Sequence, residues 1–229
     1  MQPEQFKIPS ELLIATNNRG KFIEIESLLK EISIAAIPSF QFNLEEPEET
    51  GLTFAENSLL KAKFYSLKTG LTSLADDSGL CIEELGNAPG IHSARFAIDD
   101  KTGEKNFPLA FEKIFFELKE KGFDLKSETL HKSTDKPTDK ARAHFICSLA
   151  LFNPKTNFSI SFEGRVDGTI SSQPLGNKGF GYDPIFIKNG MSQTFGEIES
   201  SLKDAISHRA EAFKKFSSWI QTWIKNGGL

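Results

Sequence analysis

A polar turn near the start of the chain has the composition of a phosphate-binding loop. Residues 12–15 are apolar, residues 16–21 read Thr-Asn-Asn-Arg-Gly-Lys, and apolar residues at helical spacing begin at Phe22. A helix N-terminus presents free N–H groups and partial positive charge, which suit a phosphate, and Lys21 adds a full charge. The turn is not a Walker A loop, because Ala15 stands where that pattern needs Gly and Phe22 where it needs Ser or Thr. An ordinary strand–helix turn with an exposed lysine remains the alternative.

Two neighbouring carboxylates follow a second apolar run, at residues 71–75. The sequence Asp76-Asp77-Ser78-Gly79 predicts a polar loop at the carboxyl end of a strand, where open α/β sheets bind ligands. Adjacent carboxylates there could hold Mg²⁺ or activate water. Because side chains alternate along a strand, the two acids need not face the same cavity. The alternative is an Asx-type turn with solvated acids.

Two loops could add ligands to such a site. Residues 45–49 carry four glutamates, and one of them could supply a second metal ligand if the loop folds back over Asp77; a solvated surface run is the alternative. In the Gly-rich segment 176–183, glycines flank Phe180 and Tyr182 and leave these rings little local cover. An exposed ring could stack on a base, although most of the 21 phenylalanines are expected in the core.

The head of the last predicted helix breaks a local rule. Ser207 is a good N-cap, but Arg209 lies in the first turn, where the helix dipole favours an acid. A residue that breaks a local rule is a hint of function. His208 by itself is more often structural, and the four histidines show no metal-ligand spacing.

The elements that must position these residues alternate between strand and helix in the first half of the chain. A capping box at Thr53 predicts a helix that ends near Gly70, and periodicity predicts another helix over 104–121. The other predicted strands cover residues 32–37, 143–152, 158–162, 166–170 and 184–187. Loops are expected at residues 86–96 and 122–140. The pattern predicts an α/β fold with a mixed sheet.

Composition narrows the class of protein. The chain has 229 residues, 38% of them hydrophobic and 25% charged, with a net charge of −4. These values fit a globular protein and argue against non-specific binding to a nucleic acid polymer. Cys81 and Cys147 form no CxxC pair, which excludes a zinc ribbon and a dithiol motif. Buried free thiols are favoured, and one long-range disulfide is the alternative. With no signal-like or membrane-spanning run, we expect a soluble cytoplasmic protein without membrane contact.

The motifs in their order closely resemble one enzyme family. They are T-x-N-x-x-K, E-E-T-G-x-T-F-x-E-N-x-x-x-K-A, A-D-D-S-G-L, A-P-G-I-x-S-A-R, G-F-G-Y-D-P-I-F and A-I-S-H-R. This order resembles the non-canonical purine nucleoside triphosphate pyrophosphatases, the inosine/xanthosine triphosphatase family, from about Leu12 to Phe213. The resemblance implies an elongated mixed sheet with flanking helices, in two lobes around a central nucleotide-binding cleft. It also implies a homodimer that uses Mg²⁺ to cleave ITP, dITP and XTP to the monophosphate and pyrophosphate.

The resemblance further implies a role for individual residues. Asp77 matches the catalytic carboxylate and metal ligand, Asp76 its helper, and Glu49 the second metal carboxylate. The substrate-binding residues that it implies are Thr16, Asn17, Asn18, Arg19, Gly20 and Lys21 for the triphosphate turn, Lys61 and Ser78, Phe180, Gly181, Tyr182 and Asp183 for the base, and Lys203, His208 and Arg209 near the base. As donors, His208 and Arg209 would favour the 6-carbonyl acceptor of a deaminated purine over the amino group of adenine.

Some features lie outside the resemblance, and other functions stay open. We expect an N-terminal extension over 1–11, a single two-lobed domain over 12–225 with a polar insertion or hairpin at 122–140, and a tail at 226–229. A related pyrophosphatase for pyrimidine or modified nucleotides is the nearest alternative. A catalytically silent nucleotide-binding regulator would have no need for Asp77, Glu49 and Lys21 together. A plain structural or interaction protein would leave Arg209 and the aspartate pair unexplained.

Overall fold

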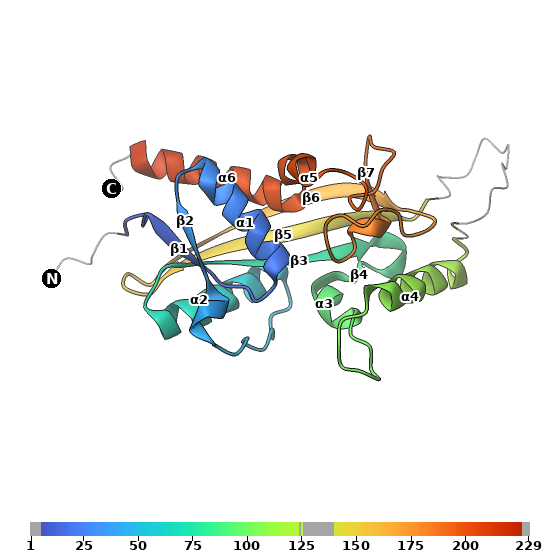
Figure 1. Ribbon diagram of the computed structural model, residues 1–229, viewed down its shortest axis with the longest axis horizontal. Coiled ribbons are helices and arrows are strands. Elements are labelled where there is room, and N and C mark those ends of the chain that lie inside the picture. The colour runs from blue at the N-terminus through green and yellow to red at the C-terminus, as the bar shows by residue number, and fades with distance from the viewer. Residues whose placement is uncertain (1–5, 124, 126–139, 226–229) are drawn as a thin grey trace. The chain divides into compact units, whose positions relative to one another are not determined.

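The computed structural model of the protein describes residues 6–123, 125 and 140–225, and these form two compact units (Figure 1). The first unit comprises Met1–Ser78, Ile146–Arg165 and Asp204–Leu229, and the second comprises Gly79–Phe145 and Val166–Lys203. The strands are β1 (Glu11–Ile14), β2 (Ala35–Pro38), β3 (Ser73–Ile82), β4 (Ala88–Pro89), β5 (Arg142–Asn153), β6 (Phe158–Ile170) and β7 (Phe186–Lys188). The α-helices are α1 (Arg19–Glu31), α2 (Phe54–Thr69), α3 (Ser93–Phe96), α4 (Phe107–Glu120), α5 (Ser200–Ile206) and α6 (His208–Lys225). Short 3₁₀ helices are η1 (Ser39–Phe42), η2 (Glu83–Leu85), η3 (Gly90–His92) and η4 (Asp183–Ile185).

In the first unit, the sheet is built on a parallel core. Strand β1 pairs in parallel with β2, where Ile14 lies opposite Pro38, and with β3, where Ile14 lies opposite Leu74. The strand order continues from β3 to β5 and β6. Alternate residues of β1 face opposite sides: Leu12 and Ile14 pack in the cluster that contains α1 and α6 residues, while Leu13 packs with α2 residues. A parallel sheet covered by helices on both faces explains why residues 12–15 are continuously apolar.

Local signals place both helices that lead to the site. The Asn18 side chain caps α1 by accepting hydrogen bonds from the amides of Gly20 (2.9 Å) and Lys21 (3.2 Å). The Thr53 hydroxyl caps α2 by accepting from the amide of Glu56 at 3.1 Å. Gly70 ends α2 with a φ of 75°, a left-handed conformation that Gly adopts at little cost. The predicted start and end of α2 are thus confirmed.

The second unit has an aromatic core. Antiparallel pairs join β3 to β4 and β6 to β7. Phe145, Phe186 and Phe195 pack against one another with ring centroids 4.7 to 6.2 Å apart. Tyr182 packs edge-on against Phe107 of α4 at 5.3 Å. These contacts fix the Gly-rich segment on α4.

The mixed α/β fold is confirmed, and several predicted element boundaries are wrong. Strand β3 does not end at Ala75 but continues through the two aspartates to Ile82. Residues 158–170 form one strand, and the expected loop 86–96 contains β4, η3 and α3. Helix α5 was not predicted, because its seven residues are too few for a clear period.

The structure tests the predictions for the N-terminal residues and the two cysteines, but only part of those for the insertion and the tail. Within the predicted N-terminal extension over 1–11, Phe6 is 4% exposed and stacks on Phe158. Both cysteines are buried, as expected, and neither forms a disulfide. The predicted insertion at 122–140 falls mostly outside the described residues, as does the tail at 226–229. Among the residues that are described, no helix is long and apolar enough to cross a membrane.

Candidate active site

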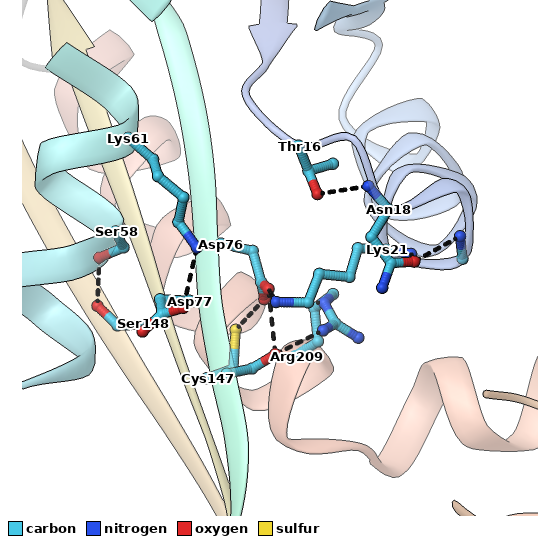
Figure 2. A network of polar contacts seen from close by, with 12 residues as sticks. Thr16, Asn18, Lys21, Ser58, Lys61, Asp76, Asp77, Cys147, Ser148 and Arg209 are labelled. Atoms are coloured by element: carbon cyan, nitrogen blue, oxygen red, sulfur yellow. Dashed lines mark hydrogen bonds and ion pairs between the residues drawn. The ribbon is translucent and has the colours of Figure 1, made fainter. Parts of the chain in front are cut away.

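Strand β3 presents its two aspartates to opposite faces of the sheet. Figure 2 shows Asp77 directed toward Lys61 of α2 and Asp76 directed toward Lys21 and Arg209. The predicted polar loop is wrong here, since both acids are buried within the strand, 1% exposed at Asp76 and 5% at Asp77. Alternation along the strand therefore gives each carboxylate a separate environment.

On the α2 face, Asp77 and Glu49 converge on one cation. Lys61 Nζ donates to Asp77 Oδ1 at 2.9 Å and to Glu49 Oε1 at 2.6 Å. The acidic loop thus folds back toward Asp77, and Glu49 is the glutamate that it brings there. Burial outweighs the attraction of Lys61 and, together with the charge of Glu49, raises the pKa of Asp77 above its ordinary value. Burial alone would lower the pKa of Lys61, but Asp77 and Glu49 raise it, so that the lysine stays charged.

The carboxylates on this face fit a divalent cation. Asp77 Oδ2 is buried and has no hydrogen-bond partner among the described residues. Mg²⁺ is usually held by one or two carboxylates together with water and substrate phosphates. No group of three or more His, Cys, Asp or Glu suited to a metal occurs in the described part of the chain. Asp77 and Glu49 could therefore hold the ion with the help of a phosphorylated ligand rather than in a cage of protein atoms alone.

On the other face, Asp76 is enclosed by hydrogen-bond donors. It forms an ion pair with Lys21 and accepts a hydrogen bond from Arg209 Nε at 3.0 Å. It also accepts hydrogen bonds from Cys147 Sγ at 2.8 Å and from the Ser78 hydroxyl at 3.1 Å. Burial alone would raise the pKa of Asp76, but Arg209 and Lys21 hold it well below its usual range. Asp76 is therefore a permanent anion, and a base with such a low pKa accepts protons poorly near neutral pH.

Arg209 is explained by its partners. The guanidinium is 1% exposed and bonds Asp76, Glu24 of α1 and, at 3.1 Å, the hydroxyl of Ser78. The attraction of Asp76 and Glu24 outweighs the repulsion between Arg209 and the positive end of the α6 dipole. Sequence reasoning missed Glu24 and Cys147. Glu24 follows Lys21 by three residues on α1, so the two side chains share a helix face, and that spacing was the available signal.

Consecutive hydrogen bonds between near neighbours in the sequence organise the predicted phosphate turn. The Thr16 hydroxyl accepts from the amide of Asn18 at 3.1 Å, and Asn18 in turn caps α1 (Figure 2). The amide of Asn17 approaches Glu46 Oε1 at 3.4 Å, and the Arg19 guanidinium lies over the Phe40 ring, 5.8 Å from its centroid. The structure brings Thr16, Asn18 and Lys21 to the end of α1, with Lys21 on Asp76, whereas Arg19 faces an aromatic ring.

In the second unit, three of the predicted base-binding residues form one cluster. Lys203 Nζ lies 4.6 Å from the centroid of the half-buried Phe180 ring and forms an ion pair with Asp183. Asp183 Oδ2 also accepts from the amide of Phe180 at 2.8 Å. Gly179 has a φ of 70°, and a Cβ there would lie 2.1 Å from the Asp183 carboxylate. The cluster therefore requires glycine and holds one face of Phe180 against a cation.

Two predicted residues lie deeper than the sequence suggested. Tyr182 was expected to have little cover, but it is 4% exposed, and its hydroxyl donates to the carbonyl of Ser93 at 2.8 Å. Its ring belongs to the aromatic core of the second unit, so that expectation is wrong. His208 opens α6 and is 4% exposed, and Ser207 caps the helix by accepting from the amide of Ala210 at 3.2 Å.

The fold and the site define an α/β protein with a carboxylate–lysine centre beside a capped helix N-terminus. The chain belongs to the Ham1 family, whose model matches residues 12–219. It is 42% identical over 208 residues to the dITP/XTP pyrophosphatase of Zymomonas mobilis, covering 90% of each chain. It is 43% identical to that of Rhodospirillum centenum, over 89% of this chain and 91% of the relative. A solved HAM1 protein from Coxiella burnetii superposes with a TM-score of 0.75 at 33% identity, over 93% of this chain and 98% of the other. The family resemblance inferred from the motifs is confirmed.

Proposed function

We propose that this protein is a Mg²⁺-dependent pyrophosphatase that hydrolyses dITP, ITP and XTP to the nucleoside monophosphate and pyrophosphate. The observation that carries the proposal is the pair formed by Asp77 and Glu49. They converge on Lys61, while Asp77 keeps a buried carboxylate oxygen without a partner among the described residues. Relatives that match about 90% of the chain are named dITP/XTP pyrophosphatases, which supports the substrate class.

The chemistry needs cations around a polyanion and a base near the α-phosphorus. Lys21, Lys61 and the capped end of α1 supply positive charge for the triphosphate. Asp77 and Glu49 would hold Mg²⁺, and the bound ion would supply positive charge that offsets the charge developing on the phosphates. Asp77, whose pKa burial raises, is the better proton acceptor of the two aspartates for the attacking water. Asp76 acts by holding Lys21 and Arg209 rather than by taking a proton.

We propose that recognition of the base depends on Phe180 and Lys203 and on donors such as His208. Phe180 can stack on a purine. Deaminated purines carry a carbonyl acceptor at position 6, where adenine has an amino donor. A buried donor that faces the adenine amino group loses its partner, which costs about 1–3 kcal/mol. The three nitrogens of Arg209 already contact Asp76, Glu24 and Ser78, so we assign it first to this network.

The proposal is tested by pyrophosphate release from a panel of dITP, XTP, GTP, ATP, UTP and dTTP, with Mg²⁺ and with EDTA. We expect Mg²⁺-dependent release from dITP and XTP at least tenfold faster than from GTP and ATP, a difference of about 1.4 kcal/mol. Equal turnover of UTP or dTTP would instead favour the pyrimidine or modified-nucleotide alternative. Nucleotide binding without pyrophosphate release by folded protein would overturn the catalytic proposal.

We also propose a homodimer, on the family resemblance alone. Size-exclusion chromatography with light scattering measures the mass in solution, and a mass twice the 25.5 kDa of one chain is expected. A mass of one chain at micromolar concentration would contradict it.

A further inference from the structure

One buried hydroxyl outside the proposed site bonds directly to the phosphate turn. Ser39, the first residue of η1, is 1% exposed, and its hydroxyl donates to the carbonyl of Thr16 at 2.8 Å. The amide of Thr16 approaches the same hydroxyl at 3.2 Å and also contacts the carbonyl of Ile14 at 2.9 Å. The Ser39 hydroxyl thus bonds both the backbone N–H and the backbone C=O of Thr16. Neither the sequence motifs nor the proposed function assigns Ser39 a role.

The sheet register explains why this serine reaches the turn. Strands β1 and β2 are parallel, with Ile14 opposite Pro38, so both chains leave the sheet at the same edge. Ser39 is the first residue beyond Pro38, and Thr16 is the second beyond Ile14. The side chain of Ser39 can therefore bond the backbone of Thr16 just beyond the last hydrogen bonds between β1 and β2.

The bond lies at the start of the chain of contacts that forms the turn. The Thr16 hydroxyl accepts from Asn18, and Asn18 caps the amides of Gly20 and Lys21. Rotation of the Thr16 backbone would move the Thr16 hydroxyl, which accepts from Asn18, and so would displace the Asn18 side chain that caps α1. The two hydrogen bonds between the Ser39 hydroxyl and the Thr16 backbone oppose that rotation, and Ser39 makes them from the start of η1.

The same segment continues into the loop that carries the metal carboxylate. Beyond η1, Glu46 reaches the amide of Asn17, and Glu49 binds Lys61. Ser39 therefore joins the phosphate turn to the start of the acidic segment. We propose that Ser39 is a positioning residue, which sets the Thr16–Lys21 turn for the triphosphate; this inference rests on the proposed function.

The test compares Ser39→Ala with wild type in dITP hydrolysis and in binding. If the turn binds the phosphates alike in the ground and transition states, KM for dITP rises about five- to tenfold while kcat changes less than about twofold. Calorimetry in the presence of Ca²⁺ should show a larger loss of affinity for dITP than for dIMP, because dIMP lacks the triphosphate that the turn is proposed to bind. Ser39→Cys keeps the size with a weaker donor and should give an intermediate KM.

Ser66→Ala is the matched control. Ser66 is also fully buried, and its hydroxyl donates to the carbonyls of Leu71 and, at 3.2 Å, of Phe152, away from the turn. It should lower the melting temperature by a similar amount and leave KM unchanged. An unchanged KM in Ser39→Ala, or equal losses for dITP and dIMP, would overturn the inference. If wild type itself releases no pyrophosphate, the proposed function fails instead, so the two failures are distinguishable.

Discussion

The two faces of β3 treat two neighbouring carboxylates in opposite ways. Asp76 meets two cations, a thiol and a hydroxyl, and its pKa is held well below the usual range. Asp77 meets one cation that it shares with Glu49, and burial raises its pKa. One step along the strand thus separates a carboxylate that organises the site from one that can act on a ligand. The difference arises from the surrounding partners and not from the residue type.

The largest effect is expected from Asp77→Asn. The amide keeps the shape of the side chain but provides neither a base nor an anionic metal ligand. Turnover of dITP should fall by about 10⁴-fold or more, or about 5.4 kcal/mol, while the folded state persists, since burial already disfavours the ionised form of this group. Pyrophosphate release and circular dichroism check the two parts. Turnover like that of wild type would remove Asp77 from the mechanism.

Asp76→Asn should instead act on stability. Removal of this buried anion leaves Arg209 and Lys21 facing a neutral group, which typically costs about 3–5 kcal/mol. Urea unfolding at neutral pH measures the loss. A cost below about 1 kcal/mol would show that the ion pairs do not hold the network together.

The same residue predicts an acid dependence. Because the folded pKa of Asp76 lies below its unfolded value of about 3.9, its stabilisation is present above that value. It is lost as the pH falls through the folded pKa. The free energy of unfolding of wild type should therefore fall in acid more steeply than that of Asp76→Asn. Equal slopes would contradict the lowered pKa.

Lys61→Met sharpens the comparison on the Asp77 face. Without the ammonium, Asp77 and Glu49 repel each other, and the pKa of Asp77 rises further. Since activity needs the carboxylate, the acid limb of the profile of kcat/KM against pH should move to higher pH, and kcat/KM should fall about 100-fold, or about 2.7 kcal/mol. Lys63→Met, an exposed lysine on the same helix, is the control and should leave the profile in place. A profile for Lys61→Met that matches the control would disprove the coupling.

The smallest effect concerns selectivity. If His208 donates to the 6-carbonyl of the base, His208→Ala should narrow the ratio of kcat/KM for dITP over dATP by about tenfold, within the 1–3 kcal/mol of one buried donor. The measurement is that ratio at fixed Mg²⁺. An unchanged ratio would place discrimination elsewhere, with Lys203 and Phe180 as the next residues to vary.

The sequence predicted the parts of this site that depend on local signals. Thr53 caps α2, as the capping box indicated, and the polar turn at residues 16–21 leads into α1, as the apolar spacing after it indicated. The partners of Asp76 could not be predicted in this way, because Arg209 lies 133 positions away. That distance also explains why Asp76 and Asp77 were assigned to a loop: two acids inside a strand become stable only with cations that the strand's own sequence does not contain.

The base-binding segment shows a second limit. Glycines next to Phe180 and Tyr182 indicated exposed rings, which is partly true of the half-buried Phe180 and wrong for Tyr182. Cover for Tyr182 comes from Phe107 and Phe111 of α4, more than 70 positions earlier in the sequence. Local composition therefore did not predict the long-range packing that covers Tyr182.

The central claim is that Asp77 acts on the ligand while Asp76 organises the site. The most direct measurement is kcat for pyrophosphate release from dITP by Asp77→Asn and Asp76→Asn, at one temperature at which both variants are folded. We expect no release above background from Asp77→Asn and measurable turnover from Asp76→Asn. Turnover by Asp77→Asn as fast as that of Asp76→Asn would contradict the division of roles across β3.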